Sequence, residues 1–354
     1  MKLFGRILAA GLLTTSLVAL AEPANATPIS WGLDRLDQPA LPGDGKFTTS
    51  FGGVGVTAYV IDTGVNLTDS GFGGRAIGDL DCNGHGTHVA GTIGSSQFGV
   101  AKQVRIVSIK VSQSCTGSVT VADLAAGMQK VLNSHPAGTP GVVNISISVG
   151  KSALIDGLVN KLHAAGLTTV VAASNTMTDA CKWSPSGAEN AFTVASANMN
   201  DFRTNNSAFG NCVDIFAPGG LIPSESLQDP SGQRVTSGTS MAAAHVSGVV
   251  ALYLQKNPFA KPVEVMSALR AGAIPNIVTN AQSAKGNFLV NTRFLEDVPA
   301  ADQNSTLVAT PAPFVATEVP GRANRLFASR SDSLFLLQWS APANLDKSGP
   351  VTYR

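Results

Sequence analysis

The sequence predicts an α/β fold built on a parallel sheet that helices cover on both faces. Apolar runs of strand length alternate along the chain with segments in which apolar residues recur at helical spacing. The strand-like runs lie at 54–60, 105–111 and 142–147, and the helix-like segments lie at 119–132 and 153–165. Because strands alternate with helices, the strands are expected to run parallel and to be buried on both faces.

Polar residues follow two of the apolar runs. Asp62 comes directly after Val60 and Ile61, and Asn175 follows the apolar run that begins at Leu167. In open parallel sheets, ligands bind beyond the carboxyl ends of the strands. We therefore expect a functional site at this edge of the sheet, with Asp62 and Asn175 in it.

The groups needed for nucleophilic catalysis occur in three short segments. These are Val60-Ile61-Asp62-Thr63-Gly64, Asn83-Gly84-His85-Gly86-Thr87-His88 and Ser237-Gly238-Thr239-Ser240-Met241-Ala242. A serine hydroxyl becomes a good nucleophile when a base takes its proton, so we expect His85 to act as the base for Ser240. Asp62 would accept the other ring N–H and fix the tautomer. The order Asp, His, Ser is that of subtilisin, and residues 28–295 resemble a subtilisin-type serine protease.

The resemblance implies the subtilisin-like three-layer fold, an acyl-enzyme intermediate and polypeptide substrates. It also places the oxyanion Asn of the family at Asn175, which would act together with the backbone N–H of Ser240. Such fixed donors meet the charge that develops on the carbonyl oxygen. The alternative for Asn175 is an ordinary turn residue at the end of a strand.

A metal pair is the alternative for His85 and His88. The pair lacks the Glu of the His-Glu-x-x-His template, and no third ligand follows nearby in the sequence. We interpret His88 and His245 as core residues, and no cofactor is expected for catalysis.

Composition predicts one large domain and a smaller segment. The chain has 354 residues, of which 44% are hydrophobic and 13% charged, with a net charge of +1. No run of basic residues interleaved with aromatic ones suggests a nucleic-acid partner. We assign residues 27–297 to the catalytic domain and expect a monomer.

The N-terminus predicts secretion. Lys2 and Arg6 precede the apolar stretch Ile7–Leu20, and small residues follow it, so residues 1–26 are expected to be a signal peptide. A membrane anchor is the alternative, but the stretch is shorter than the ~20 residues that span a bilayer. No other membrane segment is expected. Because the signal runs almost directly into the catalytic domain, we expect this domain either to refold unaided or to need an external pro-domain-like protein that assists folding or inhibits the enzyme.

Four cysteines in a secreted chain suggest two disulfides, for which the sequence alone allows three pairings. The resemblance narrows to the proteinase K branch and its aqualysin-like bacterial members on Trp31–Gln38, Asp81–His85 and Cys212–Gly219. Those relatives imply bridges between Cys82 and Cys115 and between Cys181 and Cys212. Free buried thiols are the alternative.

The same branch implies a structural Ca²⁺. Its ligands would be the carboxylate of Asp214 and the backbone carbonyls of Glu189 and Ala191, a set of hard oxygen donors in a loop. The alternative is that Asp214 is an ordinary polar residue at the start of a strand.

Substrate would pair with the edges of two segments that line the S1 pocket in relatives. The expected substrate-binding residues are Ser146, Ile147, Ser148, Ala172, Ala173, Ser174, Gly117 and Ser118. Ser148 and Ser174 stand where relatives have Gly. If their hydroxyls point inward, the pocket is narrower and favours a small P1 residue such as Ala over Phe; if they face away, specificity stays broad.

The C-terminal part differs in character from the rest. Residues 298–320 are rich in Ala, Thr and Pro and are expected to form a linker. Residues 321–354 resemble the first strands of a fibronectin type III domain, and this stretch is too short to close such a sandwich. A catalytically weak or inactive protease-like binding protein is the alternative function, suggested by the altered pocket and the short N-terminal segment.

Overall fold

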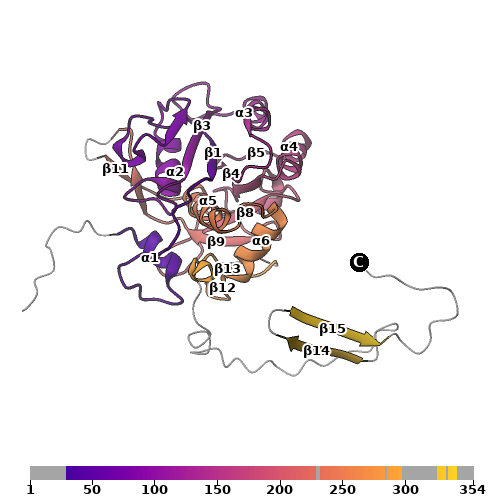
Figure 1. Ribbon diagram of the computed structural model, residues 1–354. Helices are drawn as coiled ribbons and strands as arrows, with labels where there is room; N and C mark the ends of the chain where they lie inside the picture. Colours follow the sequence, from indigo (N-terminus) through magenta and orange to yellow (C-terminus); the bar gives the residue numbers. More distant parts are fainter. Residues whose placement is uncertain (1–28, 229–231, 284, 297–324, 332–333, 341–354) are drawn as a thin grey trace, which may run out of the picture. The chain divides into compact units, whose positions relative to one another are not determined.

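The computed structural model describes residues 29–228, 232–283, 285–296, 325–331 and 334–340 (Figure 1). The chain divides into two compact units, Met1–Val298 and Pro299–Arg354, which we describe separately. The predicted signal peptide and linker lie outside the described residues. Of the second unit, the structure describes one antiparallel pair, β14 (Arg325–Ser331) and β15 (Leu334–Ser340).

A nine-stranded sheet with the order β12-β13-β9-β8-β6-β4-β1-β3-β2 forms the centre of the first unit. Every neighbouring pair is parallel except β12 with β13. This confirms the predicted fold class. The strands are β1 (Thr57–Asp62), β2 (Ala76–Gly78), β3 (Arg105–Lys110), β4 (Gly141–Ile145), β6 (Thr168–Ala172), β8 (Phe192–Ala197), β9 (Ile215–Pro218), β12 (Ile274–Pro275) and β13 (Phe288–Leu289).

Helices lie on both faces of the sheet (Figure 1). Ala58 and Val60 of β1 pack into one apolar cluster with α2 and α5, whereas Tyr59 and Ile61 pack into a second cluster with α3 and α4. Alternate strand residues point to opposite faces and both faces are covered, so β1 carries a continuous buried run from Ala58 to Ile61. The helices are α1 (Trp31–Asp37), α2 (His85–Gly94), α3 (Val121–Ser134), α4 (Ala153–Ala164), α5 (Thr239–Lys256) and α6 (Pro262–Ala271), with 3₁₀ turns at Ser70–Phe72, Ala180–Lys182 and Arg293–Leu295.

Capping explains where α3 begins. The helical spacing starts at Val119, but the side chain of Thr120 accepts the amide of Asp123, and the Asp123 carboxylate accepts the amide of Thr120. This reciprocal pair satisfies backbone donors that have no partner inside the helix. The helix therefore begins at Val121.

Two short antiparallel strand pairs of the first unit stand outside the sheet. β5 (Val149–Gly150) pairs with β7 (Trp183–Ser184), and β10 (Ile222–Glu225) pairs with β11 (Gln233–Thr236). The second pair, the β10–β11 hairpin, lies against α2, where Ser224 Oγ donates to the carbonyl of His88 at 2.8 Å. Among the described residues, no helix is both long and apolar enough to cross a membrane.

Candidate active site

Asp62 and His85 meet at the carboxyl end of β1. Asp62 is the last residue of this strand and is fully buried, and His85 is the first residue of α2. The Nδ1 atom of His85 lies 2.7 Å from Oδ1 of Asp62. This pairing makes Nδ1 the donor and leaves Nε2 of the neutral ring as the acceptor.

Ser240 lies in the first turn of α5, and its side chain is held against the end of β4. Its Oγ donates to the carbonyl of Ser146 at 3.3 Å, while Ser146 Oγ donates to the carbonyl of Ser240 at 3.2 Å. Hydrogen bonds between a nucleophile and its base are often long or absent without substrate. The reciprocal contact fixes the start of α5 beside β4.

Asn175 is oriented by the residue before Ser240. Its Oδ1 accepts the backbone amide of Thr239 at 2.9 Å and the Thr239 hydroxyl at 3.1 Å. Two donors on Oδ1 leave the Nδ2 group free to donate elsewhere. The first backbone amides of α5 also lack intrahelical partners. The Asn175 side chain is thus held at the start of α5, against the residue that precedes Ser240.

Asp81 organises the start of α2, a role that the sequence alone did not suggest. Its buried carboxylate accepts five hydrogen bonds: from the Thr63 hydroxyl, from the amides of Asn83, Gly84 and Thr87, and from the Thr87 hydroxyl. The N-cap residue Gly84 has no side chain to perform this task. An acidic residue shortly before a helix with a glycine N-cap was the available signal.

The site environment favours the charged form of His85. Burial disfavours the charge, but the adjacent Asp62 carboxylate outweighs it, and Asp81 adds to the effect, so the pKa of His85 is raised above 6.5. The side chain remains 31% exposed and accessible to substrate. A buried carboxylate that accepts the Nδ1 proton of an imidazole leaves Nε2 able to take a proton from a hydroxyl.

Comparison with known proteins identifies the family. A model of the subtilase family, Peptidase S8, matches residues 53–294. The chain belongs to the subtilase family. The extracellular serine proteinase of Thermus sp. (strain Rt41A) is 44% identical over 279 residues, covering 76% of this chain and 67% of that protein. Alkaline serine exoprotease A of Vibrio alginolyticus is 42% identical over 280 residues, and the matched part covers 76% of this chain and 52% of that protein.

The solved structures agree with this assignment. A cold-adapted subtilisin-like serine proteinase matches this subtilase with a TM-score of 0.72 and 42% identity, over 75% of this chain and 99% of that one. The predicted subtilisin-like fold is therefore confirmed, and the family is one of serine proteases.

The expected substrate segments of the subtilase lie at the ends of β4 and β6. Ser146, Ile147 and Ser148 follow β4, while Ala172 ends β6 and Ala173 and Ser174 follow it. Ser174 is buried and has a φ of +92°, a region that L residues seldom adopt. Its hydroxyl lies 3.2 Å from the Thr176 hydroxyl and is thereby already engaged.

Gly117 and Ser118 lie in the loop after Cys115. A Cβ added to Gly117 would lie 3.3 Å from Nδ2 of Asn83, so this loop adjoins the segment that carries His85. Ser118 is exposed.

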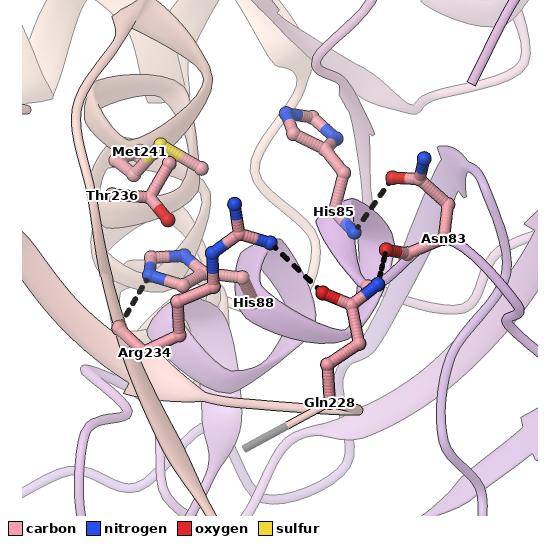
Figure 2. A pocket seen from close by; sticks show the side chains of 8 residues that line it. Asn83, His85, His88, Gln228, Arg234, Thr236 and Met241 are labelled. Atoms are coloured by element: carbon pink, nitrogen blue, oxygen red, sulfur yellow. Dashed lines mark hydrogen bonds between the residues drawn. The ribbon is translucent and has the colours of Figure 1, made fainter. Parts of the chain in front are cut away.

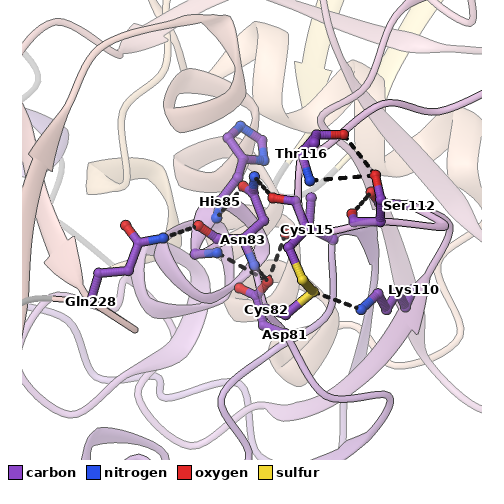
Figure 3. Close-up of a disulfide and its surroundings, with 12 residues drawn as sticks. Asp81, Cys82, Asn83, His85, Lys110, Ser112, Cys115, Thr116 and Gln228 are labelled. Atoms are coloured by element: carbon purple, nitrogen blue, oxygen red, sulfur yellow. Dashed lines mark hydrogen bonds between the residues drawn. A yellow bond between two sulfur atoms is a disulfide. The ribbon is translucent and has the colours of Figure 1, made fainter.

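Two disulfides join the pairs that the resemblance implies. Cys82 is bonded to Cys115 and Cys181 to Cys212, with Cα separations of 5.1 and 5.2 Å. Figure 3 shows the first bridge beside His85, where Asn83 Nδ2 also donates to the carbonyl of Cys115 at 2.8 Å. The bridge therefore ties the residues just before α2 to the loop after β3.

Asp214 is engaged by nitrogen donors. Its Oδ1 lies 2.7 Å from Nζ of Lys285 and 3.9 Å from Nη1 of Arg270, and its Oδ2 accepts the amide of Thr193 at 2.9 Å. A Ca²⁺ ion needs free oxygen ligands of net negative charge. With two cations already beside this carboxylate, the residues present do not fit a Ca²⁺ at Asp214. Glu189 and Ala191 lie in the turn before β8.

His88 and His245 lie in the core. Each is at most 2% exposed, and burial lowers the pKa of each to about 4. His88 Nε2 is within hydrogen-bond distance of the carbonyls of Ile222 and Arg234, at 3.0 and 3.1 Å. In the described part of the chain, no group of three or more His, Cys, Asp or Glu residues is arranged to hold a metal ion.

Proposed function

We propose that this subtilase is a secreted serine endopeptidase in which Asp62, His85 and Ser240 form the catalytic triad. The observation that carries the proposal is the 2.7 Å contact between His85 Nδ1 and buried Asp62. His85 also lines a pocket together with Met241, the residue after Ser240. Aspartate of this kind holds the imidazole in the tautomer that can accept a serine proton.

The first half of the reaction forms an acyl-enzyme. Ser240 Oγ attacks the carbonyl carbon of the scissile bond while His85 Nε2 takes the hydroxyl proton. The oxygen that becomes negative would accept hydrogen bonds from Asn175 Nδ2 and from the Ser240 amide. When the tetrahedral intermediate collapses, His85 donates its proton to the leaving amine.

The second half releases the acyl group. Water enters where the amine left, His85 takes a proton from it, and the hydroxide attacks the ester carbonyl. Collapse returns the proton to Ser240 Oγ and frees the carboxylic acid. No cofactor takes part in these steps.

A covalent probe tests the assignment. A fluorophosphonate should label the wild-type protein at Ser240 and leave Ser240→Ala unlabelled. Ser240→Ala and His85→Ala should each lower kcat on a peptide substrate by ~10⁶, and Asn175→Ala by ~10²–10³. Ser247→Ala, a second serine of α5, is the control for folding of the helix. Labelling of Ser240→Ala equal to wild type would refute the triad.

The same assay distinguishes an active protease from a protease-like binding protein. The binding protein would bind polypeptides but would not be labelled by the fluorophosphonate. Cleavage of casein at internal bonds would establish the endopeptidase activity. Secretion follows from the predicted signal peptide, and the culture medium is where the protein should be recovered. A pro-domain-like partner would show itself by accelerating refolding from denaturant.

The P1 preference remains a prediction. Ser148 and Ser174 add atoms where relatives have Gly, and the positive φ of Ser174 places the added side chain in a constrained position. We expect a higher kcat/KM for Ala than for Phe at P1. A strong preference for Phe would contradict a narrowed pocket.

A further inference from the structure

A pocket of about 360 Å³ opens directly beside His85 and Met241, the residue after Ser240. It lies between the start of α2 and the β10–β11 hairpin, and Gln228, Arg234 and Thr236 line its other side (Figure 2). None of the roles assigned to the triad or to Asn175 uses this pocket.

None of the described residues that line this pocket comes from the ends of β4 and β6, so we expect it on the leaving-group side of the site. The acyl part of the substrate is expected at the ends of β4 and β6, next to Ser146 and Asn175. Asn83 lies between the two sides, because its Nδ2 donates to the Cys115 carbonyl while its own carbonyl accepts Nε2 of Gln228. The amine that His85 protonates would therefore depart toward the pocket.

Arg234 gives this pocket its charge. Among the described residues that line it, Arg234 is the only one with a permanent charge, and none is a carboxylate. Its Nη1 donates to Oε1 of Gln228 at 3.2 Å, and no ion pair joins it to an acidic group in the described part of the chain. A neutral amide orients the guanidinium without compensating its charge.

The backbone of Arg234 is held in place. Its carbonyl lies 3.1 Å from Nε2 of His88, and Arg234 pairs with Ser224 in the β10–β11 register. His88 is buried in α2, so the hairpin and the helix are joined at this position. Figure 2 shows the Arg234 and Gln228 side chains pointing toward one another near His85. The cation is thus presented from a fixed strand.

We propose that this pocket binds a carboxylate on the leaving-group side of the substrate, with Arg234 as the residue that recognises it. The carboxylate is either the side chain of Glu or Asp in the first two residues after the scissile bond, or the free C-terminus of a short leaving peptide. This inference rests on the proposed triad. A planar guanidinium matches a carboxylate through paired N–H donors.

The pKa of His85 provides a second readout of a carboxylate bound at Arg234. The charge of Arg234 lowers the pKa of His85, although Asp62 and Asp81 keep the net shift upward. A carboxylate bound at Arg234 would offset that charge, and the acid limb of kcat would move to higher pH for acidic substrates. If Arg234 had only a structural role, the acid limb of kcat would lie at the same pH for acidic and neutral substrates.

Matched peptides test the proposal. One set carries Glu or Gln at the first or the second position after the scissile bond, with an amidated C-terminus. The other set compares a free C-terminal carboxylate with its amide in peptides that lack acidic residues. We expect kcat/KM to be about three- to fivefold higher for the carboxylate member, as for an exposed ion pair, and the ratio to shrink in 1 M salt. If the acidic member is preferred in the first set alone, the pocket binds a side-chain carboxylate. If the preference appears in the second set alone, the pocket binds a C-terminal carboxylate.

Variants assign the effect to Arg234. Arg234→Gln should lose the preference while still cleaving the neutral peptides, and Arg234→Lys should keep part of it. The control is Arg105→Gln, which removes an exposed cation from the opposite end of the sheet to Asp62. Equal rates for both members of each pair in wild type, or a preference that persists in Arg234→Gln, would overturn the proposal. If no peptide were cleaved at all, the triad assignment would fail, and the pocket's role with it.

Discussion

His245 should make the protein sensitive to mild acid through its stability rather than its chemistry. The ring is 1% exposed in the centre of α5, and its Nδ1 lies 2.9 Å from the Met241 carbonyl one turn earlier. Burial lowers its pKa from 6.5 to about 4. The unfolded chain therefore takes up a proton below pH 6.5 that the folded protein refuses, and stability falls as the pH decreases toward 4.

The magnitude follows from the two pKa values. At pH 5 an unfolded histidine is almost fully protonated and the folded one is almost neutral, so the loss relative to pH 7 is about 2 kcal/mol. Burial lowers the pKa of His88 in the same way, from 6.5 to about 4, which adds a loss of about 2 kcal/mol. The total of roughly 4 kcal/mol is a large part of the 5–15 kcal/mol typical of a folded domain.

Denaturant unfolding at several pH values provides the assay. Ser240→Ala serves as the background to prevent self-digestion, and His245→Gln in this background removes one titrating ring. The Gln variant should be less stable than its parent at pH 7 because the core contact changes. Between pH 7 and 5 it should lose about 2 kcal/mol less than the parent. Equal losses in both proteins would refute the argument.

Three further predictions concern the site and its surroundings. Because the pKa of His85 is raised and the base must be neutral, the acid limb of kcat/KM for a neutral peptide should have its midpoint above pH 6.5; a midpoint below 6.5 would contradict the effect of the Asp62 pairing. Asp81→Asn puts an N–H group against donors that now share a carboxylate, and should lower the thermal midpoint and kcat, with ~2–4 kcal/mol lost in unfolding experiments. A chelator should leave the thermal midpoint of the wild-type protein unchanged, because Lys285 already partners Asp214. In Lys285→Ala this partner is gone, and a rise of the midpoint on adding calcium would show that the ion then binds. A large drop of the wild-type midpoint with chelator would instead support a calcium site.

Local patterns were sufficient for the fold class and for the elements on which Asp62, His85 and Ser240 lie. The apolar run before Asp62 is continuous because β1 is buried on both faces, and Gly-Thr-Ser-Met-Ala opens an apolar helix in one stretch of sequence. Strand ends and helix starts are local features, so the sequence placed Asp62, His85 and Ser240 on the correct elements. Their predicted roles rest on chemistry that the probe experiment tests.

Long-range contacts could not be predicted from the same patterns. Lys285 reaches Asp214 across 71 positions, and nothing local marks either residue as half of an ion pair. Ser240 and Ser146, 94 positions apart, hold one another through hydroxyl and carbonyl groups that nearly every sequence contains. Ser174 was recognised as a departure from Gly, but its φ of +92° depends on the backbone that follows β6.

The segment Asp81–His85 shows how five consecutive residues join separate parts of the site. Asp81 holds the first amides of α2, Cys82 fixes the loop that contains Gly117, and Asn83 contacts that loop with its side chain and Gln228 with its carbonyl. His85 follows directly and takes its position from all three attachments. The loop that contains Gly117, the base His85 and the pocket lined by Gln228 and Arg234 are therefore all attached to one short piece of backbone. A displacement of this segment would move the base relative to both ends of a bound peptide, which accounts for the density of side-chain hydrogen bonds in a stretch that is itself irregular.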